Sequence, residues 1–395
     1  MESFFKTHAY LVEHINAQVR RQLMDEVDWS QRLIGIKGTR GVGKTTFLLQ
    51  YAKEHFSPTD HSCLYVNMNN FYFQVHGITE FAADFVNQGG KVLLIDQVFK
   101  QPHWSRELRK CYNLYPDLKI VFTGSSVMQL EKGNPELQGI VKSYNLRGFS
   151  FREFLNLKAG LNFSPVTLAD LMANHQSIVK DIMSIIDPSK YFTEYLDYGF
   201  YPFFMEKRNY LENLLKTMNM MTEVDILLIK QIELKYLAKI KKLFYLLAVN
   251  GIVTPNISKL AIDINTSRAT VMNYIKYLSD ARLLNIIYPA GQCFPKKPSK
   301  VMLHNPNLVN AIYPSKVSLQ KKMEIFWVNS LWKDHNISQS AHDPVYIVDN
   351  DLPFIITDVN TPPSNKYKDG AFNIQYAEGN QIKPDFPLWI FGFLY

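Results

Sequence analysis

The sequence predicts an α/β fold built on a parallel sheet, followed by a helical part and smaller domains. Short apolar runs recur between residues 32 and 123 and are separated by helical segments, which is typical of strands in a parallel sheet. The first of these runs leads directly into a glycine-rich turn. In addition, 395 residues are too many for one hydrophobic core, so two or three packed units are expected.

The first domain is predicted to cover residues 1–160. Apolar residues at helical spacing, such as Leu11, Ile15 and Leu23, predict an N-terminal helix. The strands of the sheet are predicted from the apolar runs at 32–36, 63–68, 91–95 and 118–123.

Three further domains are expected. Residues 161–237 have a helical pattern interrupted by prolines, which predicts a helical lid or connector. Residues 238–300 predict three helices separated by turns and then a strand, the order of a winged helix-turn-helix. Residues 301–395 predict a small α/β domain, with a helix at 321–333 and strands at 345–348 and 353–359.

The composition excludes several classes of protein. The 43 lysines and arginines exceed the 36 acidic residues by seven, which favours contact with phosphates but is far from polybasic. No apolar run is long enough to span a bilayer and the N-terminus does not resemble a signal peptide, so a soluble, cytoplasmic protein without a membrane partner is expected. Cys63, Cys111 and Cys293 lack the spacing of a disulfide framework or a zinc site.

Residues 38–45 read GTRGVGKT and match the phosphate-loop pattern G-x-x-x-x-G-K-[ST] between a predicted strand and a predicted helix. The glycines let backbone N–H groups converge on phosphates, Lys44 reaches the β and γ oxygens, and Thr45 can ligate Mg²⁺. A chance glycine turn is the alternative, and the flanking strand and helix disfavour it. The residues predicted to bind ATP are Gly38, Thr39, Arg40, Gly41, Val42, Gly43, Lys44, Thr45 and Thr46.

The run at 91–95 continues into a carboxylate, Asp96. Because the carboxyl ends of parallel strands meet at one edge of a sheet, Asp96 is expected beside the phosphate loop, where it would help Thr45 to hold Mg²⁺. The alternative is that Asp96 only caps the turn that follows it.

Three positions bear on hydrolysis. Gln97 follows Asp96, and its neutral amide can hold a water molecule but cannot take its proton, so turnover is predicted to be weak or absent. Thr123 and Ser125 end the next strand and are candidate sensors of the γ-phosphate, with ordinary turn chemistry as the alternative. Glu107 or a neighbouring subunit is an alternative source of a group that positions water.

Several segments of the chain resemble one family, the bacterial AAA+-type ATPases whose C-terminal domain of unknown function is similar to a decayed restriction endonuclease. The resemblance covers nearly the whole chain and rests on DWSQRLIGIKGTRGVGKTT, LLIDQVFKQPHWSRELRKCYNLYPDLKIVFTGSS, LRGFSFREFLNL, YLDYGFYPFF, HNPNLVNAI and PLWIFGFLY. It implies ATP binding by the P-loop, Mg²⁺ held with the help of Asp96, a polar sensor within residues 123–126 and an intact winged helix.

The chain departs from this family in two places. The family usually has a glutamate where this chain has Gln97, and an arginine pair where this chain has 137–139, Leu-Gln-Gly. Two losses in one mechanism suggest decay of the hydrolytic step, although Gln97 alone is also the kind of substitution made to trap ATP.

The nuclease-like pattern of the family is incomplete in the C-terminal domain. It would need clustered carboxylates and a nearby lysine to cleave a phosphodiester with metal ions. Glu324 remains with Asp349 or Asp351, Asp358 stands at the strand position, and 360–361, Asn-Thr, replaces the lysine motif. An active nuclease is therefore not expected.

The helix predicted at 268–281 could enter a DNA groove, so DNA contact through residues 257–282 is one hypothesis and a dimer or protein contact is the other. The candidates on its exposed face are Ser267, Arg268, Thr270, Asn273 and Lys276. Four nearby lysines are interpreted as a solvated helix face: Lys235, Lys239, Lys241 and Lys242.

Three functions follow from these observations. The first is an ATP-binding switch of the AAA+ type, with ATP or ADP and Mg²⁺ as ligands and little or no hydrolysis. The second is a slow Mg²⁺-dependent ATPase, and the third is a DNA-binding protein regulated by ATP. Whether the chain works as a homo-oligomer or with a protein partner is left open by the sequence.

Overall fold

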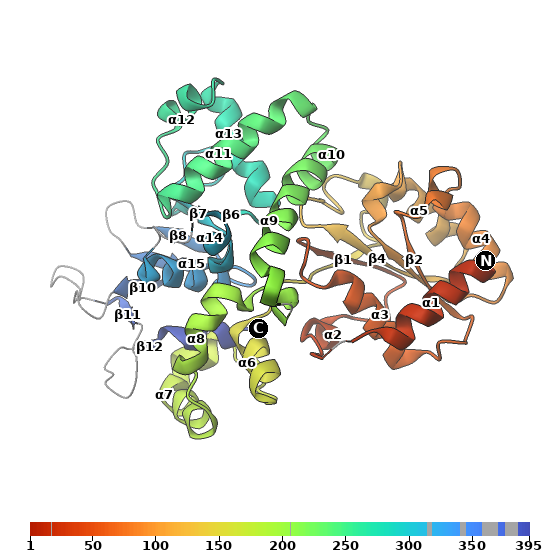
Figure 1. The fold of residues 1–395 in the computed structure, drawn as a ribbon, viewed down its shortest axis with the longest axis horizontal. Helices are drawn as coiled ribbons and strands as arrows, with labels where there is room; N and C mark the ends of the chain where they lie inside the picture. The colour runs from red at the N-terminus through yellow and green to blue at the C-terminus, as the bar shows by residue number, and fades with distance from the viewer. Residues whose placement is uncertain (17, 206, 314–317, 340–344, 358–369, 376–385) are drawn as a thin grey trace. The chain divides into compact units, whose positions relative to one another are not determined.

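The computed structural model describes all residues except 17, 206, 314–317, 340–344, 358–369 and 376–385 (Figure 1). The chain divides into two compact units, Met1–Gly148 and Phe149–Tyr395. The described part contains no helix with the length and apolar character needed to cross a membrane.

The first unit is a five-stranded parallel sheet in the order β2-β3-β4-β1-β5. The strands are β1 (Leu33–Gly38), β2 (Cys63–Asn67), β3 (Val92–Asp96), β4 (Lys119–Ser125) and β5 (Lys142–Asn145). Its helices are α1 (Glu2–His14), α2 (Leu23–Glu26), α3 (Lys44–His55), α4 (Ile78–Asn87) and α5 (Trp104–Leu114). This is the α/β fold of a P-loop NTPase that the sequence predicts.

The core of this sheet explains why the apolar runs form strands. Ile34 and Ile36 of β1 and Leu93, Leu94 and Ile95 of β3 are fully buried. Burying one such side chain contributes about 1.5–3 kcal/mol. The strand order reverses direction after β2, so right-handed crossovers place α3 on one face of the sheet and α4 and α5 on the other (Figure 1).

The second unit contains helices and a mixed seven-stranded sheet in the order β12-β11-β10-β9-β8-β6-β7. The helices are α6 (Phe151–Ala159), α7 (Leu168–Ile185), α8 (Ser189–Glu194), α9 (Tyr210–Met220), α10 (Leu227–Lys230), α11 (Leu237–Asn250), α12 (Ile257–Asp263), α13 (Arg268–Asp280), α14 (Pro306–Ile312) and α15 (Leu319–Leu331). The strands are β6 (Leu284–Pro289), β7 (Lys300–Leu303), β8 (Ile337–Gln339), β9 (Tyr346–Val348), β10 (Leu352–Thr357), β11 (Phe372–Gln375) and β12 (Phe386–Pro387).

Helices α11, α12 and α13 are followed by the antiparallel pair β6 and β7, as the sequence predicts for three helices and a strand. Asn256 caps α12 and Ser267 caps α13, each accepting a hydrogen bond from a backbone N–H three residues later. The domain boundary expected at residue 300 falls at the start of β7, and β6 also pairs with β8. One sheet therefore continues across that boundary.

Two of the quoted segments, YLDYGFYPFF and HNPNLVNAI, pack together through Asn307 of α14. This fully buried amide accepts hydrogen bonds from the backbone N–H of Phe200 and the hydroxyl of Tyr210, at 2.8 and 2.6 Å. It also donates to the carbonyl oxygens of Tyr195 and Leu196. The second unit thus has a buried polar centre in which every hydrogen bond of one side chain is used.

Candidate nucleotide site

The phosphate loop, residues 38–45, runs from the end of β1 into the first turn of α3. Gly43 has a φ of 94° and precedes α3 without a side-chain cap, so the first N–H groups of the helix are not capped by it. A Cβ at Gly38 would lie 2.4 Å from the carbonyl oxygen of Leu146, so only glycine fits there. An uncapped helix N-terminus behind a glycine turn favours binding of an anion.

Lys44 folds back over this loop. Its Nζ donates to the carbonyl oxygens of Gly38 and Thr39, at 2.9 and 2.7 Å. A phosphate oxygen is a stronger acceptor for an ammonium group than a neutral carbonyl. The ammonium is therefore already held beside the loop that would receive phosphate.

Asp96 lies at the end of β3 and is 1% exposed. Its Oδ2 accepts hydrogen bonds from Thr45 Oγ1 at 2.7 Å, Tyr65 OH at 2.9 Å and Asn67 Nδ2 at 3.2 Å, and its Oδ1 accepts one from the Thr123 hydroxyl. The structure thus brings Thr45 of the phosphate loop and Asp96 together, as the sequence predicts.

Tyr65 and Asn67 are two partners of Asp96 that the sequence motifs do not identify. Both lie on β2, two residues apart and therefore on the same face, and Asn67 is paired in register with Asp96. Burial, reinforced by the charge of Asp96, raises the pKa of the Tyr65 hydroxyl, so it stays protonated and donates. The sequence feature that points to them is Asn67, a polar residue at the end of an otherwise apolar strand.

Thr123 joins Asp96 to Gln97. Its fully buried hydroxyl accepts a hydrogen bond from the Gln97 backbone N–H at 2.9 Å while donating to Asp96. Gln97 has a left-handed backbone, with φ 56° and ψ 47°, which is uncommon for a residue with a side chain. Since both partners of Thr123 are internal, its observed role is to hold Asp96 and Gln97, and its role as a phosphate sensor stays a prediction.

The sequence profile of the AAA domain family matches residues 30–155. This range holds the phosphate loop, Asp96 and the parallel sheet just described. Residues 30–155 are an AAA domain with a P-loop.

A relative of the chain is the uncharacterized protein MJ1637 of Methanocaldococcus jannaschii. The two are 28% identical over 287 residues, which cover 66% of this chain and 58% of that protein. The chain therefore spans less than two thirds of the length of this relative.

The solved structures with some likeness to the chain include RuvB of Thermotoga maritima and the Aeropyrum pernix ORC1 protein in complex with DNA. RuvB is 15% identical with a TM-score of 0.27, covering 72% of this chain and 89% of its own. ORC1 is 13% identical with a TM-score of 0.31, and the match covers 80% of this chain and 92% of the ORC1 chain.

The remaining loop residues of the AAA domain differ in burial. Val42 is fully buried and Thr39 is 5% exposed, whereas Gly41 and Thr46 are exposed and Arg40 is half-buried. Ser125, at the end of β4, is 2% exposed and accepts a long hydrogen bond of 3.4 Å from the Val127 backbone N–H. The nucleotide contacts of these residues stay predictions.

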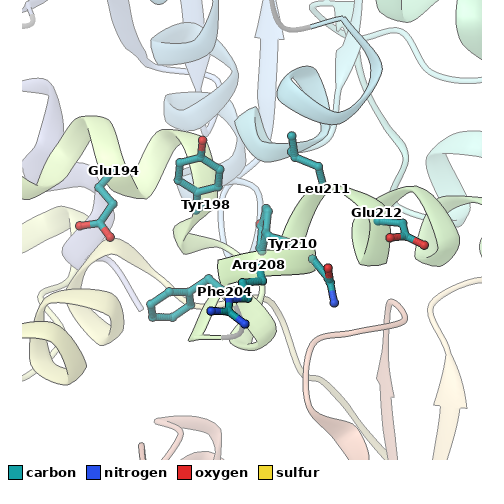
Figure 2. A pocket seen from close by; sticks show the side chains of 8 residues that line it. Glu194, Tyr198, Phe204, Arg208, Tyr210, Leu211 and Glu212 are labelled. Carbon is teal, nitrogen blue, oxygen red and sulfur yellow. The ribbon is translucent and has the colours of Figure 1, made fainter.

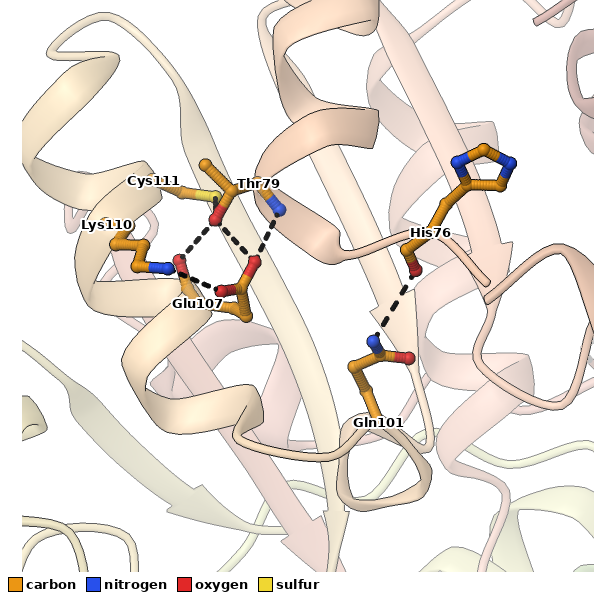
Figure 3. Close-up of polar contacts among 6 residues, drawn as sticks. All are labelled: His76, Thr79, Gln101, Glu107, Lys110 and Cys111. Carbon is orange, nitrogen blue, oxygen red and sulfur yellow. Dashed lines mark hydrogen bonds and ion pairs between the residues drawn. The ribbon is translucent and has the colours of Figure 1, made fainter. Parts of the chain in front are cut away.

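Glu107 is engaged at the contact between α5 and α4 (Figure 3). Its carboxylate accepts hydrogen bonds from the Thr79 hydroxyl at 2.6 Å and backbone N–H at 3.1 Å, and forms an ion pair with Lys110 at 3.0 Å. Burial alone would raise the pKa of Glu107, but these partners lower it below its ordinary value. Glu107 therefore ties two helices together, which does not favour it as a group that positions water.

The candidate nuclease carboxylates lie in separate networks. Glu324 binds Lys300 Nζ at 2.9 Å and the hydroxyl of Tyr346, whereas Asp349 binds His335 Nδ1 at 2.6 Å. Asp351 is exposed. Within the described residues no three His, Cys, Asp or Glu side chains gather as a metal site. Two further positions of the expected pattern, Asp358 and 360–361, lie outside the described residues.

Three of the five residues expected on the exposed face of α13 are exposed. Ser267, Arg268 and Asn273 are exposed, and Thr270 is half-buried. The Lys276 side chain is 36% exposed and forms an ion pair with Asp280 one turn later. Of the four nearby lysines, Lys235 pairs with Glu233, Lys239 donates to the carbonyl oxygen of Asn265, and Lys241 pairs with Glu223.

The second unit also contains a pocket of about 570 Å³, a volume typical of small-molecule sites. Its walls combine aromatic and charged side chains, namely Tyr198, Phe204, Tyr210, Glu194, Arg208 and Glu212 (Figure 2). The sequence pattern does not point to this pocket, because its residues come from five consecutive helical elements between Ser189 and Met220 with no shared pattern. Glu206, which lies in the chain between two of them, is outside the described residues.

Proposed function

We propose that the chain binds Mg²⁺–ATP in its phosphate loop and acts as a nucleotide-dependent switch with weak or absent hydrolysis. The observation that carries this proposal is the 2.7 Å hydrogen bond between Thr45 and Asp96. It joins the last residue of the phosphate loop to the carboxyl end of β3, which are the two parts of a P-loop site that hold the metal.

The oxygen atoms of this pair suit Mg²⁺, which prefers carboxylate, hydroxyl, water and phosphate oxygens. Thr45 and Asp96 would hold the ion, and the ion would neutralise charge on the β- and γ-phosphates. The backbone N–H groups of the loop and the ammonium of Lys44 would bind the phosphates directly. Tyr65, Asn67 and Thr123 orient the Asp96 carboxylate through their hydrogen bonds.

Gln97 is the reason to expect little hydrolysis. It follows Asp96 in the chain, and its backbone is held by Thr123. Its carboxamide makes no hydrogen bond to the described residues and would be able to hold a water molecule. An amide is not basic enough to accept a proton from that water, so attack on the γ-phosphate would be slow.

Two measurements test this function. Isothermal titration of ATP with Mg²⁺ should show binding that Lys44→Ala weakens by about tenfold or more, because a charge-assisted contact is lost. Phosphate release by the wild type should be near background, and Gln97→Glu should raise it. Equal ATP affinity of the wild type and Lys44→Ala would contradict the binding site, and no gain from Gln97→Glu would contradict the role of Gln97.

A second candidate function, regulated DNA binding through residues 257–282, is favoured by the exposed Arg268 and Asn273 on α13. The order of α11, α12, α13, β6 and β7 is that of a winged helix, and the segment between the two strands carries exposed Lys296 and Lys297. Fluorescence anisotropy of a labelled duplex over a range of salt would test it. Affinity that falls steeply with salt supports phosphate contacts, and no binding at low salt excludes this function.

A further inference from the structure

Arg21 contacts the phosphate loop from a turn that precedes α2. Although its side chain is charged, Arg21 is only 8% exposed. Nη1 donates to the carbonyl oxygen of Val42 at 3.0 Å, and Nη2 donates to the carbonyl oxygens of Arg147 and Gly148 at 2.7 and 3.1 Å. One guanidinium group therefore binds the phosphate loop and the last two residues of the first unit.

The contact with Val42 fixes the direction of one peptide group in the loop. A trans peptide is planar, with its carbonyl and N–H pointing in opposite directions. Because the carbonyl of Val42 faces Arg21, the N–H of Gly43 points away from the guanidinium. Gly43 is the left-handed residue at the start of α3, where the backbone N–H groups of a phosphate loop converge.

Lys44 binds carbonyl groups at the other end of the loop, before any nucleotide is bound. It holds the carbonyl oxygens of Gly38 and Thr39, so two cationic side chains together bind three carbonyl groups of this segment. A phosphate site needs these carbonyl oxygens turned away from the ligand, since they would repel phosphate oxygens. Donors that are oriented before binding cost no reorganisation when the ligand arrives.

We propose that Arg21 is a positioning residue of the nucleotide site, which orients the Val42–Gly43 peptide for phosphate binding without touching the nucleotide. This inference rests on the proposed function. Without the guanidinium, the buried carbonyl of Val42 loses its charged donor and the peptide is free to rotate. ATP and ADP affinity would then fall, although every residue of the phosphate loop is intact.

The neighbouring Arg20 provides a matched control. Its side chain is 46% exposed and pairs with Asp25 and Glu54, so it carries the same charge at the adjacent position but does not bind the loop carbonyls. Isothermal titration of Mg²⁺–ATP into the full chain should show affinity reduced about tenfold or more by Arg21→Ala and unchanged by Arg20→Ala. Millimolar guanidinium ion should restore part of the affinity of Arg21→Ala and none of that of Lys44→Ala.

A second variant covers the case in which Arg21→Ala does not fold. Arg21→Lys keeps the charge but cannot reach the carbonyls of Val42, Arg147 and Gly148 together, so it should fold and bind ATP more weakly than the wild type. Wild-type ATP affinity in folded Arg21→Ala or folded Arg21→Lys overturns the inference but not the proposed function. The same holds if guanidinium restores none of the affinity that Arg21→Ala has lost. Absence of ATP binding by the wild type, or wild-type affinity in Lys44→Ala, overturns the proposed function itself.

Discussion

The hydroxyl of Tyr65 donates a 2.9 Å hydrogen bond to the carboxylate of Asp96, which connects the edge strand β2 to the centre of the nucleotide site. The backbone N–H of the same tyrosine donates to Nδ1 of His8 on α1, at 3.0 Å. The N-terminal helix, the edge strand and the Asp96 carboxylate are thereby joined through one residue.

Removing the Tyr65 hydroxyl should destabilise the protein. Tyr65→Phe keeps the buried ring but leaves Asp96 without one donor, and a hydrogen bond to a charged group contributes about 1.5–3 kcal/mol. The free energy of unfolding, measured with urea, should fall by that amount. Tyr10→Phe is the control because Tyr10 is 61% exposed, and its stability should not change. Equal stability of both variants and the wild type would contradict the role of this hydrogen bond.

The burial of His8 predicts a dependence of stability on pH. Burial lowers the pKa of His8 to about 4, from an ordinary value of 6.5, so the unfolded chain binds more protons than the folded one between these values. Stability is therefore fully present above pH 6.5 and is lost as the pH falls toward 4, by about 3 kcal/mol from this group.

His8→Asn tests this dependence, since its amide oxygen can still accept from Tyr65 but does not titrate. Urea unfolding at a series of pH values should give a shallower slope for His8→Asn than for the wild type between pH 6.5 and 4. Parallel curves would show that His8 does not contribute.

Thr45 should matter for ATP binding only when Mg²⁺ is present. Thr45→Ala removes the hydroxyl that would ligate the ion, so ATP affinity with Mg²⁺ should fall about tenfold, while affinity in a chelator should match that of the wild type. Thr45→Ser keeps the hydroxyl and should bind normally. A loss of the same size with and without Mg²⁺ would place the effect of Thr45 on the loop and not on the metal.

Asn307 should be necessary for the second unit. Asn307→Ala leaves its four buried partners without their hydrogen bonds, and the free energy of unfolding should fall by about 3 kcal/mol or more. Asn219→Ala, an exposed position on α9, should be neutral. A similar small effect of both variants would show that the amide of Asn307 is dispensable.

The four apolar runs of the first domain predicted its buried strands, whereas strands that are short or have no buried residue were not predicted from the sequence, and neither was the four-residue strand β7. The strands β1 to β4 are apolar and largely buried. The edge strand β5, Lys142–Asn145, has no buried residue and is held by backbone pairing with β1. Likewise, β8 and β12 have three and two residues, too few to show periodicity.

The same distinction applies to the site. Thr45 and Asp96 could be predicted because each stands at a fixed place relative to a motif or a strand end. Tyr65 and Arg21 could not, because their contacts depend on strand order and on a turn that meets the loop from outside the motif. Thr123 was identified from its position, but the two hydrogen bonds that define what it does required the structure.

A structure of the chain crystallised with Mg²⁺ and ATP tests the central claim most directly. The β-phosphate is predicted to lie against the backbone N–H groups of residues 41–45, with Mg²⁺ beside Thr45 and Asp96. Lys44 Nζ should have moved from the carbonyl oxygens of Gly38 and Thr39 to the phosphates. A loop that keeps these internal hydrogen bonds at saturating ATP, with no nucleotide bound to it, would contradict the account.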